Sequence, residues 1–147
     1  MKAFFLSLTL FLTFSISASA DDATDVRSTI EQHYAAINSQ ENETVYGHHL
    51  PGFTMYGADG GILWEADALE TAERMKAVLP WPQLKVRMAN FNAQIYGDVA
   101  VATFYLVGTV NLDGNLQKVN NRVSAIWVRK GNEWKEAHHH ESPLVPN

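Results

Sequence analysis

The side chains best suited to chemistry lie near the C-terminus, in the run Glu136-Ala137-His138-His139-His140-Glu141-Ser142. This run falls in a predicted β-strand, where alternate residues lie on the same face. Strict alternation gives one face with Glu136, His138, His140 and Ser142, and an opposite face with Ala137, His139 and Glu141. The two faces suggest different chemistries.

The first face offers a possible metal site. His138 and His140 are two residues apart, a spacing at which a strand presents both imidazoles to one ion such as zinc. Such a site needs a ligand from a second segment, and His48-His49 is a candidate. The alternative is that His138 and His140 are exposed or lie in an interface without metal. No motif in the sequence predicts a cofactor, so none is expected.

The opposite face offers acid–base chemistry, with Glu141 and His139 as the predicted catalytic residues. A carboxyl group walled by aromatic side chains has a raised pKa and can act as a general base, with the histidine as acid or orienting group. The alternative is a solvated Glu141 at the rim of the sheet. The residues predicted to line the same pocket are Tyr34, Tyr56, Trp64, Tyr105, Val107, Arg122 and Trp127.

Helices are predicted in the first half of the chain. Apolar residues spaced four, four and three apart predict a helix over 23–39, in which Tyr34 continues the apolar stripe and its neighbour His33 is expected to face away. A short helix over 41–49 is limited by Gly47. A third helix over 67–79 begins at a possible capping box and ends before Pro80.

Strands follow the helices, with one earlier hairpin. Short strands at 53–56 and 62–64 flank Ala58-Asp59-Gly60-Gly61, a strong hairpin signal. After residue 82 the apolar period becomes two, and a phase change near Ala89-Asn90 predicts a bulged strand that bends. Turn signals at 97–98, 113–114 and 131–132 join four long antiparallel strands, of which 99–110 is apolar enough to be buried on both faces. The pattern is α+β.

The N-terminus resembles an export signal. Lys2 precedes an apolar run over 3–16, and Ala18-Ser19-Ala20 is a small-x-small cleavage site. The run is too short for a membrane span, which needs roughly 20 residues. We therefore predict a signal peptide over 1–20, one domain over 21–147, and a secreted or periplasmic location with no membrane attachment after cleavage.

Charge and composition exclude several classes. The formal net charge of −5 argues against a nucleic-acid partner, which would need a basic face. The chain has no cysteine, so a disulfide framework, a thiolate metal site and a cysteine nucleophile are all excluded.

The predicted C-terminal hairpin contains the stretches Arg122-x-Ser-x-x-Trp127, Lys130-Gly131-x-x-Trp134-Lys135 and His138-His139-His140-x-Ser142-Pro143. These stretches resemble the SnoaL-like domains of the nuclear transport factor 2-like superfamily, to which the calmodulin-dependent kinase association domain is related. The resemblance implies a cone-shaped barrel of a strongly bent antiparallel sheet wrapped around three N-terminal helices. It also implies a pocket in the cone and a homodimer formed through the outer sheet face.

The resemblance leaves the activity open. The association domain has arginines in its pocket, but Val107, Ala125 and Glu141 occupy the matching positions here. The expected ligand is therefore a small uncharged or apolar molecule. The predicted function is an exported small-molecule-binding domain, with acid–base chemistry of the isomerase or dehydratase type as an option. The alternatives are a non-catalytic homodimerisation or assembly domain, and a histidine-based metal site.

Overall fold

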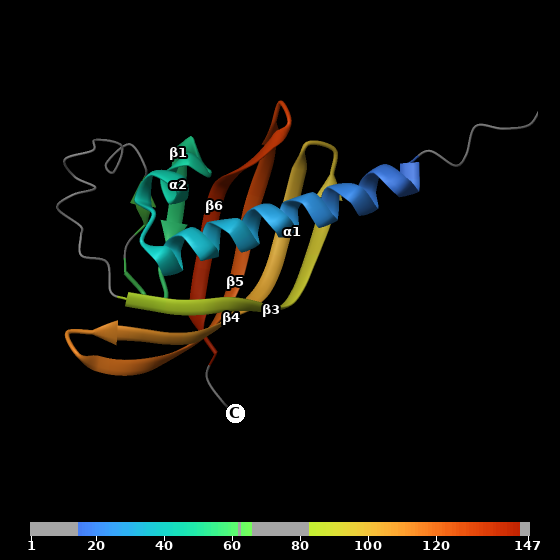
Figure 1. The fold of residues 1–147 in the computed structure, drawn as a ribbon. Coiled ribbons are helices and arrows are strands. Elements are labelled where there is room, and N and C mark those ends of the chain that lie inside the picture. Colours follow the sequence, from blue (N-terminus) through green and yellow to red (C-terminus); the bar gives the residue numbers. More distant parts are fainter. Residues whose placement is uncertain (1–14, 62, 66–82, 145–147) are drawn as a thin grey trace, which may run out of the picture.

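The computed structural model describes residues 15–61, 63–65 and 83–144. Six strands form one sheet in the order β2-β1-β6-β5-β4-β3, and α1 runs across one face of it (Figure 1). The elements are α1 (Ser15–Ser39), α2 (Asn42–Gly47), β1 (His49–Tyr56), β2 (Trp64–Glu65), β3 (Gln83–Tyr96), β4 (Val99–Leu112), β5 (Asn115–Lys130) and β6 (Glu133–Pro143).

Helix α1 covers the core with one wide stripe. Val26 and Ile30 are fully buried, and both His33 and Tyr34 are only 6% exposed. The expectation that His33 faces away is therefore wrong, because positions three and four residues after Ile30 both fall within an apolar stripe more than about 100° wide. The sheet residues in the same core include Ala102, Phe104, Val123, Ala125 and Trp127. No helix within the described residues combines the length and apolarity that a membrane crossing requires.

The end of α1 is fixed to the edge strand β3 by Asn38. Its side-chain amide donates to the Val86 carbonyl oxygen at 2.8 Å, and its side-chain oxygen accepts from the Val86 amide at 2.9 Å. Lys85 adds a bond from its Nζ to the Asn38 carbonyl oxygen. The side chain thus pairs with the backbone of β3 as another strand would, which positions α1 over the sheet.

The predicted antiparallel meander is confirmed for β3 to β6, where each strand pairs with its neighbour in sequence. The predicted bulge in β3 is also present. The β3–β4 register shifts between Ala89 and Asn92, and Asn90 has a φ of 53°. Figure 1 shows the strands curving, so that the β4–β5 hairpin bends away from the rest of the sheet. Tight turns and the phase of the apolar pattern are local signals, which is why they predicted this part well.

Two features of the expected fold need correction, and a third falls outside the described residues. The sheet is mixed, because β1 runs parallel to β6, and it stays open, with β2 and β3 at its two edges. No tight turn joins β1 to β6, so nothing local determined their relative direction. The described residues contain two helices, and the helix predicted over 67–79 lies outside them. The hairpin predicted around Asp59 is present as the antiparallel pair β1–β2.

Candidate functional site

A bulge in β6 brings Glu136 to the inner face of the sheet. The β5–β6 register pairs Trp127 with Glu136 but Ile126 with His138, so Ala137 is an extra residue in β6. The bulge reverses the alternation, and Glu136, which is 2% exposed, lies on the same face as His139, which is 6% exposed. Strict alternation had placed Glu136 with His138, and that expectation is wrong for this reason.

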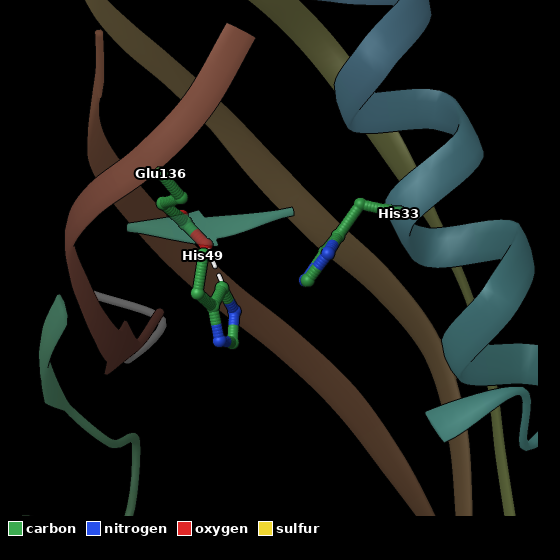
Figure 2. A group of neighbouring side chains, drawn as sticks. All are labelled: His33, His49 and Glu136. Carbon is green, nitrogen blue, oxygen red and sulfur yellow. Dashed lines mark ion pairs between the residues drawn. The ribbon is translucent and has the colours of Figure 1, made fainter. Parts of the chain in front are cut away.

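Three side chains from three elements converge at this point (Figure 2). His33 extends from α1, His49 begins β1, and Glu136 lies in β6 directly opposite His49 in the parallel β1–β6 pair. Each offers one ligand atom, and these atoms lie within 4.8 Å of one another. His49 Nε2 is 3.5 Å from Glu136 Oε2, and the His49 ring is stacked on Phe53 at 3.9 Å between ring centroids. The stacking restricts the orientation of the His49 imidazole.

His139 lies between two carboxylates on the same face. Its Nδ1 is 2.9 Å from Glu136 Oε1, and its Nε2 is 3.6 Å from Glu141 Oε2. Asn121 on β5 donates from Nδ2 to the other oxygen of Glu141 at 2.6 Å. The result is a continuous chain of polar contacts from Asn121 through Glu141 and His139 to Glu136.

The charges of this chain follow from burial and pairing. Burial alone would lower the pKa of His139, but the charge of Glu136, the hydrogen bond to it and the nearby Glu141 carboxylate raise it to about 9. Burial would raise the pKa of Glu136, yet the charge and hydrogen bond of His139 lower it. The pKa of Glu141 is also lowered, because the nearby His139 imidazole and the hydrogen bond from Asn121 outweigh its burial. At neutral pH this chain of contacts therefore carries two carboxylates and one imidazolium. The prediction that burial raises the pKa of Glu141 is wrong.

The imidazoles of His33 and His49 have lowered pKa values, in contrast to His139. Burial lowers the pKa of His33 to about 3 and that of His49 to about 4, despite the opposing effect of Glu136. Both are neutral at pH 7, and neutral imidazole has a nitrogen lone pair available. The Nδ1 atom of His33 is buried without a hydrogen-bond partner.

The structure divides the predicted pocket residues between the two faces. Tyr34 and Trp127 are buried on the inner face, as are His139 and most of Glu141. Tyr105 is 37% exposed and pairs with Arg122 across β4–β5, so neither shares a face with Trp127. Val107 follows Tyr105 by two residues and lies on the same outer side. A surface pocket of about 390 Å³ includes Tyr105 and Arg122.

The remaining predicted residues lie away from the cluster. Tyr56 is 44% exposed and contacts the rings of His138 and His140. Trp64 pairs through its backbone with Met55, and its side chain is outside the described part of the structure. His138 accepts or donates a hydrogen bond with Thr54 at 2.8 Å between Nδ1 and Oγ1. His138 and His140 thus lie on the face opposite the buried cluster, so the predicted metal pair is not part of it.

Two residues of the cluster formed by His33, His49 and Glu136 were not predicted from the sequence to lie there. Glu136 was assigned to the wrong face because a single alanine gives no signal for a bulge. His33 does have a signal, since it lies three residues after Ile30 on the apolar stripe. His49 is one of the two residues predicted to supply a metal ligand from a second segment. In the structure it lies beside Glu136, on the face opposite His138 and His140.

The family comparison agrees with the fold. A model of the SnoaL-like domain matches residues 26–146 of this chain. The chain belongs to the SnoaL-like domain family. The matched residues include the β5–β6 hairpin, whose strand β6 carries Glu136, His139 and Glu141.

Solved structures with the same fold include CaMKII association domains, a proposed dehydratase and proteins of unknown function. The association domain of CaMKII from C. elegans is 20% identical, with a TM-score of 0.69 over 86% of this chain and 98% of its own. A proposed dehydratase of the NTF2-like family from Streptomyces avermitilis is 16% identical, with a TM-score of 0.72 over 86% and 99%. An NTF2-like protein of unknown function from Pseudomonas putida is 16% identical, with a TM-score of 0.67 over 90% of each chain. No curated protein matches the sequence. These likenesses place the SnoaL-like chain in the NTF2-like fold.

Proposed function

We propose that this SnoaL-like domain binds a small uncharged molecule at the inner face of its sheet and transfers protons with His139 and Glu141. The reaction type is isomerisation or dehydration, in which a proton is removed next to a carbonyl group. The observation that carries the proposal is the position of His139 between the carboxylates of Glu136 and Glu141.

The contacts suggest a role for each side chain. Glu136 is the most buried of the three and holds the His139 ring through Nδ1. Glu141 has a side chain that is 17% exposed, so it is the carboxylate nearest to solvent. A buried histidine with one nitrogen bonded to a carboxylate and the other facing a second carboxylate is oriented for proton exchange. Glu141 is thus the proposed catalytic residue that contacts the ligand, His139 exchanges protons with it through Nε2, and Glu136 is a positioning residue.

The net charge supports an uncharged ligand. Two carboxylates and one imidazolium leave one net negative charge on the chain of contacts. A buried negative charge repels carboxylates and phosphates, because little solvent screens it. The dehydratase proposed for the Streptomyces avermitilis protein on the same fold is compatible with this reaction type.

Glu141→Gln tests the proposal. The assay follows deuterium incorporation from D₂O into a panel of uncharged ketones with a β-hydroxyl group or a β,γ double bond. We expect the wild type to exchange or convert at least one ketone, and Glu141→Gln to slow that reaction by about 100- to 10,000-fold. Native mass spectrometry should show that the variant still binds the same ketone.

His140→Gln is the matched control, because His140 lies on the opposite face of the same strand. It should retain the wild-type rate. The proposal is wrong if the folded wild type acts on no ketone of the panel, or if Glu141→Gln reacts as fast as the wild type.

We also propose that the domain is exported, on the strength of the cleavage pattern at Ala18-Ser19-Ala20. Exported protein should then begin at Asp21, and a Met1 N-terminus would contradict this. Cleavage there would keep Asp22, which forms an ion pair with Arg129 of β5.

Assembly through the outer sheet face is a second candidate function. The similar CaMKII domains are named as hub and association domains, which points to oligomeric assembly. The outer face exposes Tyr56, Tyr105 and Ile126 by 44%, 37% and 37%. Strand β4 was expected to be buried on both faces, but in the single chain its Tyr105 side is open. A second copy of the chain would cover that side.

We therefore expect a homodimer at micromolar concentration, with an interface of the usual size, about 1,200–2,000 Å² in total. Ile126→Asp places a charge in that interface and should give a monomer in sedimentation velocity experiments. Tyr96→Asp is the control, because Tyr96 ends β3 at the turn to β4 and is 64% exposed. A wild type that sediments as a monomer would refute the dimer.

A further inference from the structure

We propose that His33, His49 and Glu136 form a binding site for a divalent transition-metal ion of the zinc type. The site goes beyond the proposed proton transfer, since it needs no substrate and uses two residues with no part in that reaction. It is also distinct from His138 and His140, which lie on the other face of the sheet.

The chemistry of the donors selects the ion. Two imidazole nitrogens and one carboxylate oxygen are a common protein ligand set for zinc, and they leave a further coordination position for water or a ligand. Calcium and magnesium prefer shells made of oxygen, so they fit this set poorly. The three residues come from α1, β1 and β6, so a bound ion would join the helix to the sheet.

The burial and orientation of His33 fit metal binding. His33 is 6% exposed, its Nδ1 has no hydrogen-bond partner, and its ring points toward His49 and Glu136 (Figure 2). A buried polar atom without a partner is uncommon in a folded protein and needs an explanation. Direct coordination by His33, or a shift of its ring upon metal binding, would supply one.

The distances are close to those of a metal site. The three ligand atoms lie within 4.8 Å of one another, whereas two ligands on a tetrahedral zinc ion are about 3.4 Å apart. Closing the site requires a contraction on the order of 1 Å, which side-chain rotations provide. The ring stacking of His49 on Phe53 and the backbone pairing of His49 with Glu136 keep two of the ligands in place.

The side chains around Glu136 also orient it for metal binding. Its Oε1 faces His139 and its Oε2 faces His49, so one oxygen is oriented by a hydrogen bond while the other is directed to the site. Metal-binding carboxylates are commonly oriented in this way by a second layer of hydrogen bonds. Glu141 lies beyond His139 and offsets the positive charge of that imidazole, which is the nearer of the two to the site.

The test uses the full chain, freed of metal by a chelator and then titrated with Zn²⁺ or Co²⁺ against a chromophoric competitor. We expect one ion per chain, a visible Co²⁺ spectrum, and a rise in Tm of about 5 °C or more at saturating metal. His49→Ala and Glu136→Gln should each weaken Zn²⁺ binding at least about 100-fold, since even residues outside the ligand set commonly change affinity 10- to 100-fold. Circular dichroism verifies that each variant is folded.

His138→Ala and His140→Ala are the controls on the other face of β6, and both should bind Zn²⁺ as the wild type does. Ca²⁺ should not raise the Tm. The site is refuted if the folded wild type binds neither Zn²⁺ nor Co²⁺ at 100 µM, or if His49→Ala and Glu136→Gln bind like the wild type. It is equally refuted if only the two controls lose binding. None of these readouts involves ketone turnover, so this site and the proposed activity can fail independently.

Discussion

Glu136→Leu is expected to lower the free energy of unfolding by about 3–5 kcal/mol, because it removes the nearer carboxylate of the buried His139 and leaves only Glu141, 3.6 Å from its Nε2. The contact joins His139 Nδ1 to Glu136 Oε1 at 2.9 Å, and both side chains are almost fully buried. Removing one member of a buried pair costs far more than the pair itself contributes. Urea unfolding in the presence of a chelator measures this cost apart from any effect of metal.

The double variant Glu136→Leu/His139→Leu separates pairing from simple loss of packing. With both polar groups replaced, the remaining carboxylate is Glu141, which is 17% exposed and keeps the hydrogen bond from Asn121, so about 2 kcal/mol or more of the lost stability should return. Glu133→Leu is the control on the same strand. The Glu133 side chain is 71% exposed and pairs with Lys135 at the surface, so its loss should barely change the unfolding midpoint. The single variant His139→Leu completes the comparison. If the losses of unfolding free energy in Glu136→Leu and His139→Leu simply add up in the double variant, the two residues are not coupled.

Gly108→Ala is expected to destabilise the protein by about 3 kcal/mol, because β3 passes too close to β4 for a side chain at Gly108. A Cβ atom at Gly108 would overlap the Lys85 carbonyl oxygen and lie 2.8 Å from the Val86 Cα. These are backbone atoms of the paired strand, and Val86 is the direct partner of Gly108 in the β3–β4 register. Relief would require the two strands to separate, and Val86 is also bound to Asn38 of α1.

Gly47→Ala is the matched control, because a Cβ atom there would meet nothing within 4 Å. Its stability should stay the same or rise by up to about 1 kcal/mol, as when a glycine with a compatible conformation is replaced. Urea unfolding compares both variants with the wild type. A Gly108→Ala variant as stable as Gly47→Ala would show that β3 and β4 can separate without cost.

The sequence determined the elements that depend on near neighbours. Tight turns at 97–98, 113–114 and 131–132 defined the antiparallel meander, and the phase change near Ala89-Asn90 located the bulge in β3. Each signal comes from a few adjacent residues, where turn chemistry and period-two burial act directly. The family was also predicted from the sequence, because the residues that carry the resemblance follow one another along the β5–β6 hairpin.

The tertiary structure alone decided how the cluster is assembled. His33 and His49 meet Glu136 only because α1 crosses the sheet and β1 docks parallel to β6, and no turn joins these segments in sequence. The bulge at Ala137 reversed the face of Glu136 without any signal in residue type. Alternation along a strand holds until one inserted residue changes it, and whether that residue is tolerated depends on the partner strand. The sequence therefore provided the acids and imidazoles, whereas the pairing of distant segments determined which of them are in contact.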